Sequence, residues 1–125
     1  MKTSLIILLC KMLRLAGKMV GKGSSLPGRI ALKLDPDILR NIKLPSEIIA
    51  VTGSNGKTVT KEWIAQLCPP GVKLFRSPKS YNSQIGVPLS LLMIAGDEQI
   101  AVIETGISEK GEMERLERIV RPDIG

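Results

Sequence analysis

The sequence has 125 residues with 18 basic and 12 acidic side chains, which gives a net charge of +6, and it contains no histidine. This length suits one domain of ordinary size or a piece of a larger one, and an apolar fraction of 43% excludes global disorder. The missing histidines exclude a histidine general base and a histidine-ligated metal site. Three aromatic residues argue against stacking on single-stranded nucleic acid. Two cysteines are too few for a zinc cluster and fit a reducing compartment.

The positive charge is concentrated in the N-terminal third of the chain. Residues 1–45 carry nine basic and two acidic side chains, whereas residues 46–125 carry nine basic and ten acidic ones. Such asymmetry indicates an arm that meets a membrane surface or a partner, more than a nucleic-acid-binding domain. We therefore predict no nucleic-acid partner.

Residues 1–22 are predicted to form a basic amphipathic helix. The apolar run 5–10 is far shorter than the roughly 20 residues of a membrane span, and it does not suit a signal peptide. The basic residues at helical spacing would form one stripe: Lys11, Arg14, Lys18 and Lys22. Such a helix would either lie on anionic lipid or pack its apolar face on a neighbouring domain or subunit. The sequence favours neither of these alternatives.

Residues 23–45 are predicted to be a linker followed by a short helix. The segment 21–28 is rich in Gly, Ser and Pro, which ends the first helix. Asp35 is a suitable N-cap and Pro36 suits the first helical position, so we expect a short helix over 35–42 that Pro45 breaks.

Residues 46–125 alternate between strand and helix patterns. The continuous apolar run 48–51 is typical of a buried parallel strand. We expect strands over 48–51, 72–75 and 99–104, helices over about 58–68, 88–94 and 111–120, and a polar loop over 76–84. This β-α-β-α-β-α order predicts a partial α/β fold, with a parallel sheet in three layers and right-handed crossovers. A fourth strand is due at 123–125, so we interpret the chain as a fragment truncated at its C-terminus.

The segment VTGSNGKT, between the first strand and its helix, is predicted to be a nucleotide phosphate loop (P-loop). Gly53 and Gly56 allow positive φ angles that turn backbone N–H groups toward a polyphosphate, and the helix N-terminus adds partial positive charge. Lys57 can reach the β- and γ-phosphates, and the Thr58 hydroxyl can ligate Mg²⁺. The pattern G-x-x-x-x-G-K-[ST] lacks its first glycine, because that position is Val51. The flanking strand and helix favour a phosphate loop over a structural turn.

Two further groups of polar residues follow the second and third strands, at the sheet edge where open α/β folds bind ligands. Asn82 and Ser83 would contact phosphates or a metal-bound water, or alternatively cap the third helix. Glu104 ends the third strand and is a natural Mg²⁺ ligand; the alternative is a solvated residue or a charge near a helix N-terminus. The remaining acidic residues of the last helix region are expected on a solvated face: Glu109, Glu112, Glu114 and Glu117.

Three motifs in this order resemble the Mur ligase family: TGSNGKT at 52–58, YNSQIGVPL at 81–89 and VIETG at 102–106. Gly111-Glu112 and Arg121-Pro122-Asp123 extend the resemblance, which covers about residues 46–125; the missing first Walker glycine is normal in that family. The second and third motifs look most like the branch that adds D-alanyl-D-alanine to a UDP-N-acetylmuramoyl tripeptide. Residues 24–45 instead look like the Mur-ligase-like subunit of the lipid II amidating enzyme.

The resemblance implies ATP and Mg²⁺ as cofactors in peptidoglycan precursor synthesis. Family members transfer the γ-phosphate to a substrate carboxylate, and an amine then attacks the acyl phosphate. By matching positions, Lys57 would hold the phosphates, while Thr58 and Glu104 would bind Mg²⁺. The nucleotide contacts would come from Gly53, Ser54, Asn55, Gly56, Lys57, Thr58, Asn82 and Ser83.

The implied partners are a UDP-linked or lipid-linked muramoyl peptide and an amine substrate. The implied location is the cytoplasm, with residues 1–22 on an anionic membrane surface at the inner face or on a partner subunit. The family's N-terminal UDP-sugar domain and C-terminal domain have no counterpart in this sequence, so this chain alone is expected to be inactive. The alternative function is a non-catalytic P-loop module that binds nucleotide and carries a membrane-associating arm.

Overall fold

The computed structural model describes residues 5, 8, 12, 38–79 and 81–125, which belong to two units, 1–42 and 43–125. In the first unit, Leu5, Leu8 and Met12 are helical and exposed, and α3 spans Ile38–Asn41 within the helix expected over 35–42. The predicted cationic stripe and the linker over 23–34 lie outside the described residues. In the described part of the chain, no helix combines the length and the apolar content needed to cross a membrane.

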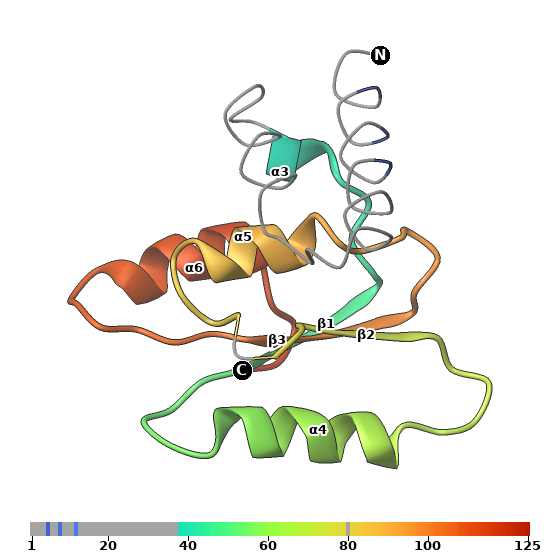
Figure 1. Ribbon diagram of the computed structural model, residues 1–125, viewed down its shortest axis with the longest axis horizontal. Helices are drawn as coiled ribbons and strands as arrows, with labels where there is room; N and C mark the ends of the chain where they lie inside the picture. The colour runs from blue at the N-terminus through green and yellow to red at the C-terminus, as the bar shows by residue number, and fades with distance from the viewer. Residues whose placement is uncertain (1–4, 6–7, 9–11, 13–37, 80) are drawn as a thin grey trace. The chain divides into compact units, whose positions relative to one another are not determined.

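The second unit is built on a sheet of three parallel strands in the order β1-β3-β2 (Figure 1). The strands are β1, Glu47–Val51, β2, Leu74–Arg76, and β3, Ile100–Glu104. The register pairs Val51 with Glu104, so the carboxyl ends of β1 and β3 lie side by side. This confirms the predicted parallel α/β sheet.

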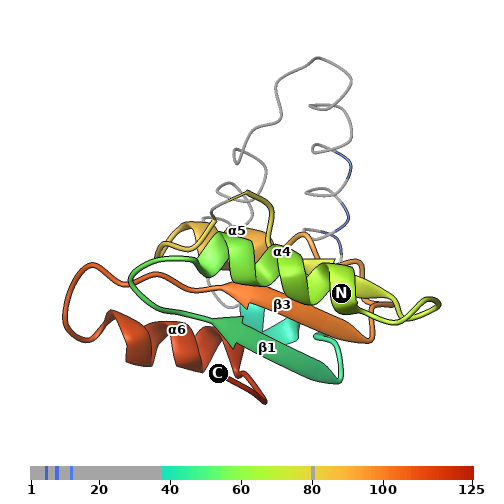
Figure 2. The same ribbon diagram turned by 90° about the horizontal axis from the view of Figure 1, so that it is seen from below.

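Helices cover both faces of this sheet, as the three-layer prediction requires. Helix α4, Lys57–Leu67, lies on one face, and α5, Gly86–Leu91, and α6, Glu112–Val120, lie on the other (Figures 1 and 2). The core consists of aliphatic side chains from β1, β3, α5, α6 and the residues just after α5: Ile48, Val51, Ala101, Val102, Ile103, Val87, Leu89, Leu91, Leu92, Ile94, Leu116 and Val120. Burying these apolar surfaces is the main stabilising contribution to the unit.

The last residues run along the free edge of β1. Ile124 forms a parallel bridge with Ile49, the Ala50 N–H donates to the Ile124 carbonyl over 2.8 Å, and the Asp123 N–H donates to the Ile48 carbonyl over 2.8 Å. This is the position at which a fourth strand is expected. The edge strand β1 therefore has a partner on the side away from β3.

Some element bounds differ from those expected, and local hydrogen bonding explains the differences. Strand β2 begins at Leu74 and includes Arg76, because the Val72 N–H turns back to the Pro69 carbonyl and Arg76 pairs with Val102. Helix α5 begins two residues before Pro88 and ends at Leu91. A proline is tolerated there because the first turn of a helix has no internal partners for its N–H groups. The other bounds of this unit agree to within one residue.

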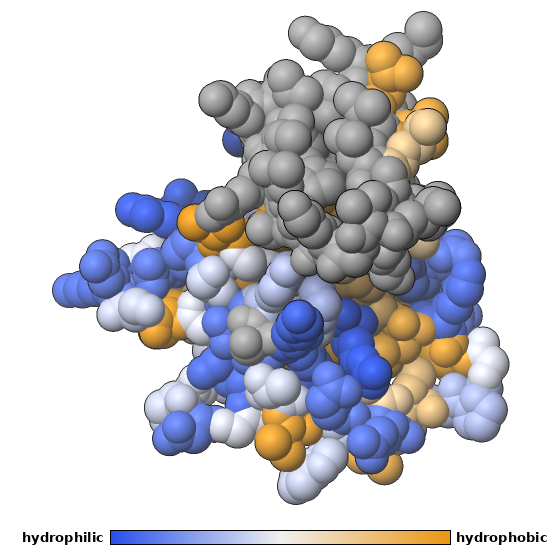
Figure 3. Space-filling model, in the orientation of Figure 1, coloured by the Kyte–Doolittle hydropathy of each residue, from blue (hydrophilic) through white to orange (hydrophobic). Residues whose placement is uncertain are grey.

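Helix α4 exposes apolar residues and buries a charged one. Val59, Trp63 and Leu67 recur every four residues and are exposed, and the single buried residue of this helix is Lys61. Figure 3 likewise shows hydrophobic residues among the hydrophilic ones along the lower edge, where α4 lies in Figure 1. The buried side of α4 therefore holds a charged side chain, whereas three of its apolar side chains face solvent.

The loop between β3 and α6 is closed by the carboxylate of Glu112. Its Oε2 accepts hydrogen bonds from the N–H groups of Ser108 over 2.6 Å and Glu109 over 3.1 Å. These backbone bonds, with a smaller contribution from the charge of Arg115, lower the pKa of Glu112 below its ordinary value of 4.5. Glu112 therefore organises this loop from the solvated side of α6, where Glu114 of the same helix is exposed.

We expect Glu112→Gln to reduce the sensitivity of folding to acid. Since the folded pKa is depressed, the carboxylate stabilises the fold fully above its unfolded pKa, and this contribution is lost as the pH falls through the folded pKa. The variant should be less stable than the wild type at neutral pH and should converge with it in acid. Urea unfolding across this range measures the effect, with Glu114→Gln as the control. Parallel stability curves for wild type and Glu112→Gln would contradict it.

Candidate functional site

The loop after β1 has the backbone conformation that the sequence predicts. Gly53 has φ 134° and Gly56 has φ 77°, values that side-chain-bearing residues rarely adopt. Gly56 immediately precedes α4, whose N-terminus has no side-chain cap, and the first helical hydrogen bond runs from the Thr60 N–H to the Gly56 carbonyl. The amide groups ahead of Thr60 therefore have no partner within the helix and suit an anion.

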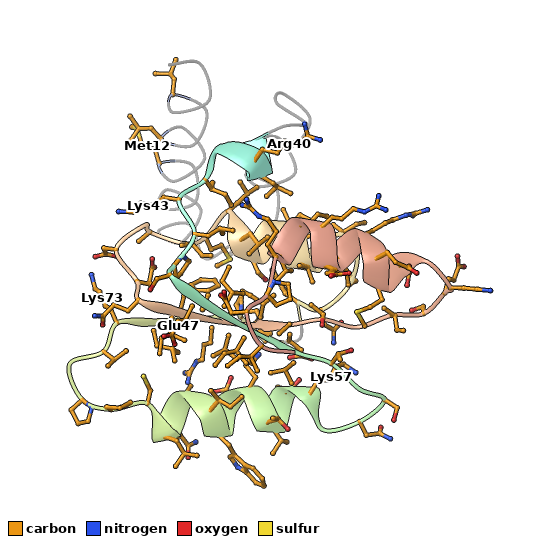
Figure 4. All side chains as sticks on the ribbon, turned by 180° about the vertical axis from the view of Figure 1, so that it is seen from behind. Met12, Arg40, Lys43, Glu47, Lys57 and Lys73 are labelled. Atoms are coloured by element: carbon orange, nitrogen blue, oxygen red, sulfur yellow. The ribbon has the colours of Figure 1, made fainter. Side chains whose placement is uncertain are left out.

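Lys57 lies at the junction of this loop and the helix. Its Nζ donates to the Gly53 carbonyl over 2.7 Å, so the ammonium lies back along the loop. Figure 4 shows Lys57 at the start of α4, at the opposite end of the sheet from Lys73 and Glu47. The cation is thus placed at the carboxyl edge of the sheet, where the phosphate-loop prediction requires it.

The three predicted groups of polar residues converge on the carboxylate of Glu104. This side chain is 1% exposed, at the end of β3. Thr58 Oγ1 donates to the carboxylate and lies 3.1 Å from Oε1 and 3.0 Å from Oε2, and Asn82 Nδ2 donates to Oε1 over 2.8 Å. Residues far apart in the sequence therefore form one hydrogen-bonded cluster. Glu104 is not a solvated residue, the alternative that its position at a strand end left open.

Two members of this cluster were not identified from the sequence. Lys61 Nζ lies 3.3 Å from Glu104 Oε2, and the Glu104 N–H donates over 2.9 Å to Oγ of Ser77, which is buried. Lys61 is three residues after Thr58, so helical spacing places both on the same side of α4. This spacing could have identified Lys61 from the sequence, whereas no pattern around Ser77 indicates that it contacts Glu104.

Around this cluster is a hollow of about 270 Å³. It is lined by Ser54, Asn55, Gly56, Lys57, Thr58, Val59, Asn82 and Glu104. Gly53 and Ser83 lie outside this lining. Ser83 Oγ instead accepts the Gly86 N–H over 3.0 Å at the start of α5. Of the two roles considered for this segment, capping the helix and contacting the ligand, Ser83 takes the first, and Asn82 lies in the cluster around Glu104.

The donor set of the hollow fits a magnesium ion that is bound together with phosphates. Thr58 and Glu104 supply hard oxygen ligands, and in the described part of the chain no three His, Cys, Asp or Glu residues group as a metal cage. Mg²⁺ commonly takes one or two carboxylates and completes its shell with water and substrate phosphates. The residues present therefore suit a nucleotide-bound ion.

Gly86 packs tightly against the loop that carries Asn82, and a methyl group there should distort it. A Cβ at Gly86 would lie 3.0 Å from both the Cα and the carbonyl carbon of Tyr81, which are backbone atoms that cannot move aside cheaply. We expect Gly86→Ala to lower the free energy of unfolding by about 1–3 kcal/mol, as overpacking does. Urea unfolding measures this, with Gly125→Ala as the control, because a Cβ there meets no atom within 4 Å. Equal stabilities of the two variants would contradict it.

Comparisons with known proteins are consistent with this geometry. The family described as "Mur ligase middle domain" matches residues 51–125. The UDP-N-acetylmuramoyl-tripeptide–D-alanyl-D-alanine ligase of Borreliella burgdorferi is 46% identical over 76 residues, which are 61% of this chain and 16% of that protein. The ligase of the same name from Bacillus subtilis is 40% identical over 81 residues, 65% of this chain and 18% of that protein.

A second kind of relative matches more of the chain. The subunit MurT of the glutamine-hydrolyzing lipid II isoglutaminyl synthase of Staphylococcus aureus is 33% identical over 120 residues, 93% of this chain and 27% of that protein. A crystal structure of MurF from Acinetobacter baumannii superposes with a TM-score of 0.64 at 33% identity, over 75% of this chain and 21% of that one. The chain thus spans between 16% and 27% of the length of these relatives.

Proposed function

Because the chain belongs to the Mur ligase family, we propose that it is the ATP-binding portion of an amide ligase in peptidoglycan precursor synthesis. The observation that carries the proposal is the convergence of Thr58, Asn82 and Glu104 beside a glycine-rich loop and an uncapped helix N-terminus. Such a loop recognises polyphosphate, and a hydroxyl and a carboxylate beside it suit the accompanying cation. Both cofactors, ATP and Mg²⁺, are part of the proposal.

Each residue has a defined task in this proposal. Lys57 and the first-turn N–H groups of α4 hold the β- and γ-phosphates and stabilise charge that develops during phosphoryl transfer. Thr58 and Glu104 hold Mg²⁺, which when bound neutralises phosphate charge. Asn82 fixes Glu104 Oε1 through its amide. Ser54 and Asn55 line the hollow and are placed to contact the nucleotide.

The complete ligase would join a muramoyl peptide to an amine. The γ-phosphate is transferred to the peptide carboxylate, and the amine displaces phosphate from the resulting acyl phosphate to give an amide, ADP and phosphate. Addition of D-alanyl-D-alanine is favoured by the 46% identity to the ligase of that name. The proposed location is the cytoplasm.

A subunit of a lipid II amidating enzyme is the second candidate. The match to MurT covers 93% of the chain and therefore includes most of residues 1–45, a segment outside the matched middle domain. In that case the substrate would be lipid-linked rather than UDP-linked. A nucleotide-binding module without ligase activity would share the same loop and is less favoured by membership of a ligase family.

Calorimetric titration of the 125-residue chain with ATP, ADP and AMP in excess Mg²⁺ tests the proposal. Since the loop recognises the β- and γ-phosphates, we expect saturable binding of ATP and ADP and much weaker binding of AMP. Absence of ATP binding would overturn the proposed function. Equal affinity for all three nucleotides would show recognition of the nucleoside alone and would contradict the phosphate-loop assignment.

The N-terminal arm is proposed to associate with an anionic membrane surface. Leu5, Leu8 and Met12 are helical and exposed, and the same stretch of sequence carries the basic residues Lys2, Lys11 and Arg14. Co-sedimentation with anionic and with neutral vesicles tests this. Binding to the anionic vesicles alone is expected. Equal recovery with both would contradict the dependence on anionic lipid, and recovery with neither would favour a protein partner for this arm.

A further inference from the structure

The most deeply buried charge in the second unit belongs to a residue that the proposed function does not use. Lys61 of α4 is 0% exposed and is the largest fully buried side chain of the described residues. A buried ammonium group is costly unless it is paired and hydrogen-bonded. The position therefore requires an explanation beyond packing.

The ammonium of Lys61 connects three segments of the chain. It forms an ion pair with Glu104 Oε2 at 3.3 Å, at the end of β3, and it donates to the carbonyl of Lys79, in the loop that leads to Asn82. Lys79 has φ 49°, a left-handed conformation that is strained for a residue other than glycine and is held only when its surroundings fix it. The contact with Lys61 is one such restraint.

The partners of Glu104 divide its two carboxylate oxygens between them. Asn82 donates to Oε1, Lys61 lies against Oε2, and Thr58 Oγ1 reaches both. Removing the Lys61 ammonium would release Oε2 from its charged partner among the described residues. The same change would release the Lys79 carbonyl, and with it the loop that positions Asn82.

We propose that Lys61 is a positioning residue, which orients the Glu104 carboxylate toward a divalent cation bound with the nucleotide. The inference rests on the proposed function and adds a part that the phosphate loop alone does not supply. Lys61 does not line the hollow, so its ammonium acts on the cation through Glu104, whereas Lys57 does line it. Groups that orient metal ligands in this way typically change metal affinity by about 10- to 100-fold when removed.

Two physical effects of Lys61 on a cation at Glu104 have opposite signs. A positive charge 3.3 Å from Oε2 weakens the attraction between the carboxylate and a second cation. The same charge holds the carboxylate in place, and the proposal requires this orienting effect to be the larger one. Replacing Lys61 by a neutral residue of similar length therefore distinguishes the two: cation binding weakens if orientation dominates and strengthens if repulsion dominates.

The experiment is a Mg²⁺ titration of ADP affinity, followed by calorimetry, for the wild type, Lys61→Met and Lys73→Met. Lys73 is the matched control, because it is 63% exposed and pairs with Asp97 at the other end of the sheet (Figure 4). We expect Lys61→Met to keep the Mg²⁺-free ADP affinity of the wild type. It should need at least about tenfold more Mg²⁺ than the wild type to reach half of the increase in ADP affinity that Mg²⁺ produces. Lys73→Met should need the same Mg²⁺ concentration as the wild type.

A wild-type or lower Mg²⁺ requirement in Lys61→Met would overturn the inference and leave the proposed function standing. A wild-type chain that binds no ADP would instead overturn the proposed function. If Lys61→Met does not fold by circular dichroism, Lys61→Arg replaces it, because it keeps a charge beside Glu104 but presents a planar guanidinium of different geometry. Lys61→Arg should still raise the Mg²⁺ requirement; a wild-type requirement would show that Lys61 only compensates charge and would overturn the inference.

Discussion

Lys57→Ala is expected to weaken ATP binding about 30- to 150-fold, which corresponds to about 2–3 kcal/mol for the loss of a charged hydrogen-bond donor. Lys57 lines the hollow, and its Nζ already lies along the loop through its bond to the Gly53 carbonyl. A phosphate in the loop would offer this ammonium a charged acceptor in place of a neutral carbonyl, and charge-assisted bonds are roughly twice as strong. The measurement is calorimetric titration with ATP and Mg²⁺.

The fold should tolerate this substitution, which makes the binding result interpretable. The side chain of Lys57 makes an exposed bond to its own loop, so its loss should change the free energy of unfolding little. Lys73→Ala removes a lysine from the far end of the sheet and is the control for lost positive charge. ATP affinity that is unchanged in Lys57→Ala would contradict the assignment of the phosphate loop.

Much of the fold could be predicted from local sequence patterns. The apolar run of β1 and the glycines of the following loop define a strand, a turn and a helix start without any knowledge of tertiary structure. The bounds of β2 could not be predicted in this way, because a three-residue strand is defined by its pairing with β3. Pairing is a tertiary property, so sequence patterns locate such a strand only approximately.

The cluster around Glu104 could be predicted where a residue type and a strand end coincide. Glu104 is the last residue of β3, and the segments that follow β1 and β2 carry Thr58 and Asn82, at the edge where parallel sheets gather polar side chains. Lys61 was missed because a lysine within a helix usually marks the solvated face, and in α4 the burial pattern is reversed. The reversal depends on what packs beneath the helix, which local sequence does not record.

Ser83 shows the opposite limit of sequence patterns. Asn and Ser beside each other before a helix serve equally well as caps or as ligands, and their side-chain chemistry does not distinguish the two roles. The structure separates them by geometry alone: Asn82 reaches Glu104, and Ser83 reaches the Gly86 N–H. The contribution of Ser83 to nucleotide binding therefore stays a prediction, whereas its support of α5 is a contact of the folded chain.

The two acidic partners of Lys61 should differ greatly in their value to the fold. Glu104→Gln leaves a fully buried ammonium without its buried counter-charge, and breaking a buried pair in this way costs about 3–5 kcal/mol. Glu62 also lies near Lys61 Nζ, at 3.7 Å, but its side chain is 37% exposed and pairs with Arg76 at 2.9 Å. Exposed pairs contribute at most about 1 kcal/mol, so Glu62→Gln should have a small effect.

Urea unfolding of the two glutamine variants, beside the wild type, measures this difference directly. The substitutions are chemically identical and both remove one negative charge near the same lysine, so a general effect of net charge would lower both stabilities equally. A large loss of stability in Glu104→Gln alone would show that the burial of the ion pair, and not the net charge, causes the effect. If Glu104→Gln unfolds with wild-type stability, the Lys61 ammonium must be satisfied by the Lys79 carbonyl and Glu62, and the cluster would not depend on its central carboxylate for stability.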